Sequence, residues 1–140
     1  MSQYRILVTA AGGALAPMNI QLMKAGERHD IWVAAVDTQT NAAGRYFADA
    51  FETVPYGGDD GYVEAIAAIV ERHSIDLVLP WSDEEALSLS GERERIENHG
   101  AILACTDTAT LQVMNDKAAT FRALSDSGLP VPSWDLVEDR

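Results

Sequence analysis

Short apolar segments alternate with helical patterns along almost the whole of this 140-residue chain. The apolar segments are nearly continuous, which is typical of strands that helices cover on both faces. We expect strands at residues 5–10, 31–36, 52–54, 75–80 and 101–105. We expect helices at residues 17–25, 43–49, 62–73, 82–98, 107–114 and 116–127. Because parallel strands are joined by right-handed helical crossovers, this alternation predicts an α/β fold, a doubly wound Rossmann-like parallel sheet of four to five strands with helices on both faces.

Residues at the expected helix starts fit this pattern. Pro17 suits a first helical position, because its missing N–H has no intrahelical partner there. Ser82 and Glu85 have the spacing of a capping box, in which the serine oxygen accepts an N–H and the glutamate reaches back. Asn115 is expected to cap the last helix, which Gly128 ends. These boundaries place the loops that follow the strands at one edge of the sheet.

Composition and charge exclude several classes of function. The mass of 15.2 kDa corresponds to one domain. Ten Lys and Arg against 22 Asp and Glu give a formal net charge of −12, which would repel phosphate backbones, so we expect no nucleic-acid partner. No apolar run approaches the ~18 residues that a membrane span needs, so we expect no membrane partner. The single cysteine, Cys105, cannot form an internal disulfide, which favours a cytoplasmic protein.

The candidate binding residues follow the expected strands, where ligands of doubly wound sheets bind. They are Gly12 and Gly13 after the first strand, Asp37 after the second, and Ser82, Asp83 and Glu85 after the strand at 75–80. N–H groups at the start of the helix at 17–25 could receive an anion, or the turn could simply pack tightly against the sheet. Asp83 and Glu85 could bind a substrate amine, or they could only favour the positive end of their helix.

The glycine turn is a poor match to a dinucleotide-binding fingerprint. In its best register, residues 11–16, only the middle glycine, Gly13, is in place. Asp37 could touch a ribose, although an aspartate at a strand end is as often a turn former. A free-standing nucleotide- or dinucleotide-binding Rossmann-like module is therefore the alternative function.

No catalytic residue or metal site is predicted. Cys105 has no Cys or His partners at metal-binding spacing, and the serines lack a nucleophile-elbow pattern. A phosphorelay receiver is disfavoured, since no acidic pair follows the first strand. Lys117 is unusual, because a cation in the first turn of a helix opposes the helix dipole. A bound nucleotide phosphate would explain Lys117, and the neighbouring Asp116 could equally offset its charge.

Four blocks, taken in order, resemble the N-terminal domain that precedes the ATP-grasp fold. They are ILVTAAGG at 6–13, AVD at 35–37 leading to FADAFETVP at 47–55, IDLVLPWSDEE at 75–85, and NDK at 115–117 leading through Phe121 to GLPVP at 128–132. Together they cover nearly the whole chain. The resemblance is to the carbamoyl-phosphate synthase large-subunit-like branch, which includes the pyrrolysine-synthesis ligase.

The resemblance implies an enzyme that joins a carboxylate to an amine, using ATP to form an acyl phosphate. In that family the nucleotide and magnesium are held mainly by two later subdomains, and the preceding domain forms one wall of the substrate cleft. The resemblance gives Lys117 a contact with the ATP phosphates and places Asp83 and Glu85 near the substrate. It brings Gly12 and Gly13 to the same cleft, where we also expect Asp37 and Ser82 on the substrate side.

The resemblance also sets expectations for domains and partners. We expect a pre-ATP-grasp domain at 1–128 and, at 129–140, a linker into an ATP-grasp domain that lies outside this sequence. ATP and Mg would belong to the parent protein, with no cofactor tightly bound to this chain, which we do not expect to turn over alone. The expected partners are that ATP-grasp domain and a small-molecule carboxylate, and a homodimer is compatible with the sequence. Neither the acid nor the nucleophile is identified, because motifs do not encode pocket shape.

Overall fold

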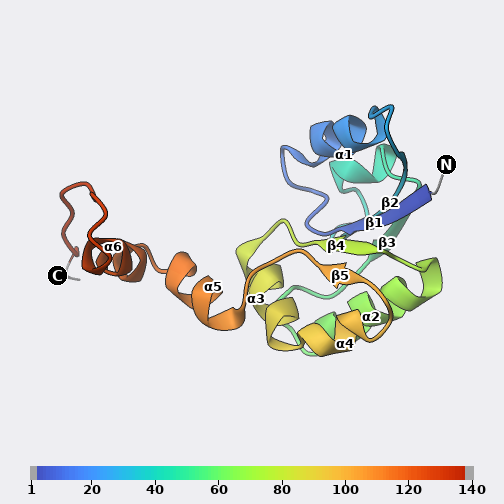
Figure 1. The fold of residues 1–140 in the computed structure, drawn as a ribbon. Helices are drawn as coiled ribbons and strands as arrows, with labels where there is room; N and C mark the ends of the chain where they lie inside the picture. The colour runs from blue at the N-terminus through green and yellow to red at the C-terminus, as the bar shows by residue number, and fades with distance from the viewer. Residues whose placement is uncertain (1–2, 138–140) are drawn as a thin grey trace. The chain divides into compact units, whose positions relative to one another are not determined.

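The computed structural model describes residues 3–137 and contains a five-stranded sheet (Figure 1). The strands are β1 (Gln3–Val8), β2 (Asp30–Asp37), β3 (Ala50–Thr53), β4 (Leu77–Leu79) and β5 (Ile102–Leu103). All four strand pairings are parallel, and the order across the sheet is β3-β2-β1-β4-β5. The predicted doubly wound parallel sheet is confirmed.

Helices follow the strands in the expected order. They are α1 (Ala16–Lys24), the 3₁₀ helix η1 (Ala43–Tyr46), α2 (Tyr62–His73), α3 (Asp83–Gly91), α4 (Arg93–Glu97), α5 (Thr108–Asn115) and α6 (Lys117–Asp126). The chain forms two compact units, Met1–Cys105 with the sheet and Thr106–Arg140 with α5 and α6. The domain boundary expected at residue 128 stays a prediction. No helix among residues 3–137 has the length and apolar character needed to cross a membrane.

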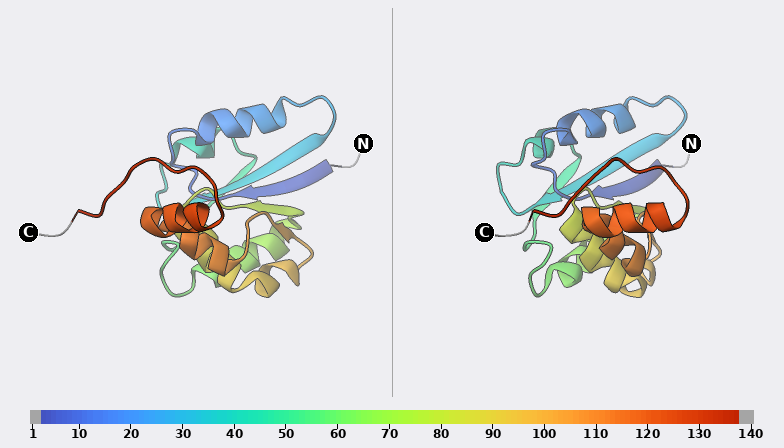
Figure 2. Two further views of the ribbon diagram at one scale, coloured as in Figure 1. Left: turned by 60° about the vertical axis from the view of Figure 1, so that its left-hand side comes forward. Right: turned by 90° about the vertical axis from the view of Figure 1, so that its left-hand side faces the viewer.

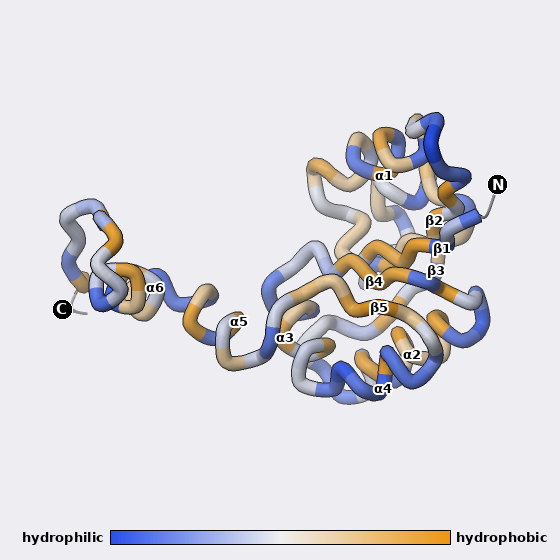
Figure 3. Tube along the Cα trace, viewed as in Figure 1, coloured by the Kyte–Doolittle hydropathy of each residue, from blue (hydrophilic) through white to orange (hydrophobic). Residues whose placement is uncertain are grey.

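Helices cover both faces of the sheet, as predicted (Figure 2). On one face, called the α2 face below, α2, α3 and α4 pack on alternate strand residues such as Leu7 and Val78. On the other, called the α1 face, α1 and the segment around η1 pack on Ile6, Val8 and Val33. Successive strand residues therefore enter opposite cores, which explains why the strands are apolar almost without interruption (Figure 3).

The single helix expected at 82–98 is wrong, because the chain breaks it into α3 and α4. Glu92 lies between them with φ −121° and ψ 34°, outside the helical region. The next residue, Arg93, donates from its guanidinium to the backbone oxygens of Leu103 at 2.9 Å and Cys105 at 2.6 Å. This link between α4 and the β5 end orients α4 so that Ile96 is fully buried.

The cap of α6 also differs from the expectation. Asp116, and not Asn115, is its N-cap, and the Asp116 carboxylate accepts hydrogen bonds from the N–H groups of Ala118 and Ala119 at 2.8 and 3.1 Å. An aspartate satisfies the free donors of the first turn as well as an asparagine does. The sequence pattern therefore located the helix start to within one residue.

Candidate functional site

The strand order places the candidate site between β1 and β4. The chain moves from β1 toward one edge of the sheet through β2 and β3, and then returns to build β4 and β5 on the other side. Ligands of open α/β sheets bind at such a switch point, outside the carboxyl ends of the strands. The segments that leave β1 and β4 there are residues 9–15 and 80–82.

The turn after β1 is closed by a carboxylate of this chain. Asp37, at the end of β2, is only 9% exposed, and its two oxygens accept hydrogen bonds from the N–H of Gly12 at 2.7 Å and of Gln39 at 2.9 Å. A Cβ atom at Gly12 would lie 3.0 Å from Asp37 Oδ2, so a side chain there would push the carboxylate away and this approach favours glycine. The structure thus shows Asp37 holding the turn, which is one of the two roles that the sequence left open.

Two further N–H groups beside the turn are also occupied. Gly13 donates to the oxygen of Ala10 at 3.0 Å, Ala16 donates to the oxygen of Gly13 at 3.0 Å, and Pro17 has no N–H. A phosphate-binding turn needs free N–H groups that point at the anion. Here the donors of Gly12, Gly13 and Ala16 are taken and the Asp37 carboxylate lies against Gly12, so the geometry disfavours a pyrophosphate at the two glycines.

A second buried carboxylate ties the end of β1 to the start of α3. Glu85 is 7% exposed, and its Oε2 accepts from the hydroxyls of Thr9 at 2.5 Å and Ser82 at 2.9 Å. The Thr9 hydroxyl also accepts from the backbone N–H of Trp81 at 3.0 Å. Ser82 caps α3 by accepting the N–H of Glu85 at 3.3 Å, which confirms the expected serine cap. The Glu85 carboxylate therefore forms hydrogen bonds with neighbouring side chains, at the edge of the sheet where we expected a substrate.

Tyr62 belongs to the same cluster and was not predicted as a site residue. Its side chain is fully buried at the start of α2, and within residues 3–137 its hydroxyl has no hydrogen-bond partner. Burial raises the pKa of Tyr62 far above its ordinary value, and the charge of Glu85 raises it further, so the phenol stays neutral. In the sequence, Tyr62 is one of several apolar positions on a helical face, and no local pattern indicates which polar group its hydroxyl approaches.

An uncharged pocket opens beside the glycine turn on the α1 face. Its volume is about 360 Å³, and it is lined by Ala10, residues 13–16, Asn19 and Trp81. Trp81 is partly buried against the α1-face core, and its backbone is held by Thr9. The pocket therefore lies at the switch point, with the start of α1 on one side and Trp81, two residues after β4, on the other.

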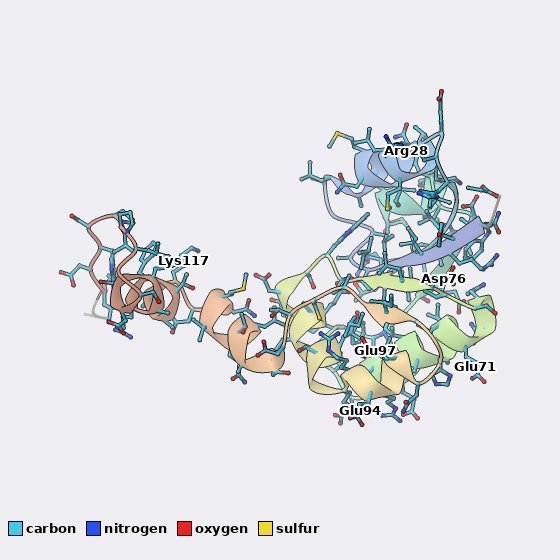
Figure 4. The ribbon with its side chains drawn as sticks, viewed as in Figure 1. Arg28, Glu71, Asp76, Glu94, Glu97 and Lys117 are labelled. Atoms are coloured by element: carbon cyan, nitrogen blue, oxygen red, sulfur yellow. The ribbon has the colours of Figure 1, made fainter. Side chains whose placement is uncertain are left out.

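The predicted site residues fall into two groups. All six substrate-side residues lie at or after the carboxyl ends of β1, β2 and β4, namely Gly12, Gly13, Asp37, Ser82, Asp83 and Glu85. Asp37 and Glu85 are buried, whereas Asp83 is exposed in the first turn of α3. Lys117 lies in the other unit, as the first residue of α6, with its side chain exposed (Figure 4). Among residues 3–137, no group of three or more His, Cys, Asp and Glu side chains could hold a metal ion.

The family model for the PylC-like N-terminal domain matches residues 6–104, so the chain belongs to this family. The match covers the sheet except for the first three residues of β1, and it includes both carboxylates and the glycine turn. No curated protein sequence matches the chain significantly.

Solved structures share the fold at low sequence identity. N5-carboxyaminoimidazole synthetase from Staphylococcus aureus, complexed with ADP, is 18% identical with a TM-score of 0.65, over 89% of this chain and 30% of that chain. An ADP complex of N5-carboxyaminoimidazole ribonucleotide synthetase is 23% identical with a TM-score of 0.65, over 94% and 30%. The biotin carboxylase subunit of a pyruvate carboxylase is 19% identical with a TM-score of 0.63, over 91% and 28%. The chain thus spans about 30% of the length of the first of these structures.

Proposed function

We propose that this chain is the substrate-side N-terminal domain of an ATP-dependent ligase that joins a carboxylate to an amine through an acyl phosphate. The family match over residues 6–104 carries the proposal. The likeness to two synthetases complexed with ADP supports it, since the shared region forms about 30% of each of those chains. The enzyme's carboxylate and amine are small molecules whose identity the proposal leaves open.

In this proposal the nucleotide and its magnesium belong to an ATP-grasp domain of the same polypeptide. A biotin carboxylase domain with the same fold was solved with magnesium ADP and bicarbonate, which supports ATP and Mg in the parent protein. The described residues of this chain offer no metal-binding cluster, and the glycine turn is closed by Asp37. These residues therefore do not fit magnesium or a polyphosphate, and we derive no chemical step through either group here.

The residues of this chain would form one wall of the substrate cleft. Asp83 has an exposed carboxylate at the positive end of α3, suited to bind a substrate ammonium group. Asp37 and Glu85 would act as positioning residues, because their oxygens hold the turn after β1 and the loop after β4. Gly12 and Gly13 let this turn lie close to the sheet. The wall would thus be held in shape before substrate arrives, which limits the ordering cost of binding.

Lys117 would contact the ATP phosphates in the full-length protein. Lys117 is the first residue of α6 and its side chain is exposed. The positive end of the helix dipole disfavours a cation there, and a bound phosphate would neutralise both the lysine and the helix end. Lys117→Ala should weaken ATP binding by about 1–3 kcal/mol, the range for a charge-assisted hydrogen bond. Lys24→Ala is the matched control, because Lys24 pairs with Asp49 at 2.5 Å in the sheet unit and should leave ATP affinity unchanged. Equal ATP affinity for Lys117→Ala and the parent protein would show that Lys117 does not contact the ATP phosphates.

The gene beyond codon 140 gives an independent test of the same proposal. A reading frame that continues into an ATP-grasp module would supply the lysines and acidic magnesium ligands that the family uses. An in-frame stop there would count heavily against a ligase. A cytoplasmic location, which the single cysteine Cys105 supports, and a homodimer are further parts of the proposal.

A further inference from the structure

The pocket beside the glycine turn has the size of a small-molecule site. Its volume of about 360 Å³ lies near the lower end of the range for ligand pockets, roughly 300–1,000 Å³. It is suited to a group such as one ring or one branched aliphatic chain. It also lies at the switch point of the sheet, where ligands of this fold class bind.

The side chains that line this pocket carry no charge. The lining is alanine, leucine and glycine apart from Asn19, which carries an amide, and Trp81, whose apolar ring carries one N–H. Trp81 offers the largest apolar surface, and its backbone N–H is fixed by the Thr9 hydroxyl at 3.0 Å. An apolar group makes no hydrogen bonds to water, so it could bury its surface in this pocket without a desolvation penalty.

An anion would meet no cationic side chain in the lining and a negative charge nearby. The N–H groups of Gly13 and Ala16 donate to backbone oxygens within the turn, and the Asn19 N–H donates to the oxygen of Leu15 at 3.0 Å. The neighbouring Gly12 N–H is taken by the Asp37 carboxylate, which carries the same sign of charge as a phosphate. Asp83, two residues after Trp81, adds a further exposed negative charge.

We propose that this pocket binds an uncharged apolar group of the substrate, an aromatic ring or a branched aliphatic chain, in preference to a phosphate. The assignment of this group to a substrate rests on the ligase function proposed above. The substrate class is therefore a carboxylate or amine that carries an apolar side chain, in contrast to a sugar phosphate.

The test is a titration of the 140-residue chain with matched probes, followed by amide NMR shifts. Benzyl alcohol carries an aromatic ring, inorganic phosphate carries the anion, and phenyl phosphate carries both. Together they separate binding of the ring from binding of the phosphate. Benzyl alcohol should shift the amides of residues 13–16 with a dissociation constant on the order of 1 mM, as expected for so small a ligand. Phenyl phosphate should bind at least about tenfold more weakly, and inorganic phosphate should leave these amides unchanged.

Two exposed alanines give a matched pair of variants. Ala14→Phe should fill the pocket and weaken benzyl alcohol at least about tenfold, whereas Ala68→Phe, on the exposed side of α2, should leave it unchanged. Leu15→Ala, which trims a side chain that is 64% exposed, should weaken binding by a smaller factor while keeping the fold.

Tighter binding of phenyl phosphate than of benzyl alcohol at these amides would overturn the proposal. Absent shifts with benzyl alcohol would also overturn it, as would shifts that Ala14→Phe leaves intact. Neither ATP nor a catalytic domain enters the titration, so a failed titration would leave the ligase role standing. That role is tested separately by ATP affinity in the full-length protein.

Discussion

The two faces of the sheet are built differently. The α2 face is covered by three helices and holds the larger core, which includes Tyr62, Ile66 and Leu89. The α1 face has one α-helix and η1, and its buried cluster is smaller. The uncharged pocket lies on this second face, beside the start of α1. The comparison suggests that the α2 face supplies most of the stability, while the thinner α1 face is left open for a ligand.

The largest expected effect compares one isoleucine from each face. Ile66 and Ile20 are both fully buried. Ile66→Ala should lower the free energy of unfolding by about 4–5 kcal/mol, because its site is enclosed by packed helices and cannot collapse. Ile20→Ala should cost about 2–3 kcal/mol, because α1 can settle toward the sheet. Denaturant unfolding measures both, and equal or reversed losses would contradict the difference between the faces.

The next effect concerns the polar cluster at the switch point. Thr9→Val should cost about 1–3 kcal/mol, because it leaves the Trp81 N–H without its acceptor and removes one donor from buried Glu85. Thr53→Val, at the exposed last residue of β3, is the control and should change the unfolding free energy by less than about 0.5 kcal/mol. If both variants behave alike, the cluster is not a structural link between β1 and α3.

A smaller loss is expected at the glycine turn. Asp37→Asn keeps the shape but can accept from only one of Gly12 and Gln39, so it should cost about 1–2 kcal/mol. Asp60→Asn, on an exposed loop, should be near neutral. Thermal unfolding of the two variants separates these outcomes, and a neutral Asp37→Asn would mean that the turn holds itself.

The sequence predicted the fold well and the site less well, for a physical reason. Strand and helix patterns are local, so the parallel sheet and the residues at its carboxyl edge could be predicted from periodicity. The function of Asp37 and Glu85 depends on which groups meet across the fold, 25 and 76 residues apart along the chain in the bonds to Gly12 and Thr9. No local pattern specifies such partners.

The break after α3 and the surroundings of the Tyr62 hydroxyl also depend on tertiary contacts, which local sequence patterns do not specify. Arg93 reaches the backbone of β5, and this tertiary contact accompanies the interruption of a helix that local propensity favoured. Tyr62 could be assigned to a core face, but the neighbour of its hydroxyl could not. The uncharged pocket was likewise missed, because its lining comes from the first turn of α1 and from Trp81 after β4.

The smallest effect is a pH dependence far from the pocket. Partial burial raises the pKa of Glu52, but hydrogen bonds from Arg72 and His73 outweigh it and hold the pKa below its usual value. A lowered folded-state pKa means that this stabilisation is present above about pH 4.5 and is lost as the pH falls through the folded-state value. The contribution should be under about 1 kcal/mol, since the side chains are partly exposed and screened.

Glu52→Gln should therefore lose less stability than the parent between about pH 5 and about pH 3, the range in which carboxylates take up protons. Glu71→Gln, at an exposed position of α2, is the control and should follow the parent (Figure 4). The measurement is urea unfolding across this pH range. Parallel curves for the parent and Glu52→Gln would show that the ion pair adds nothing measurable.

The central claim is that the switch point of this sheet serves the substrate and is closed to nucleotide phosphates. Calorimetric titration of NAD and of ATP into the 140-residue chain tests it most directly. The account predicts dissociation constants on the order of millimolar or weaker for both, because Asp37 occupies the glycine turn. Micromolar binding of NAD would contradict the account and favour a free-standing dinucleotide-binding module.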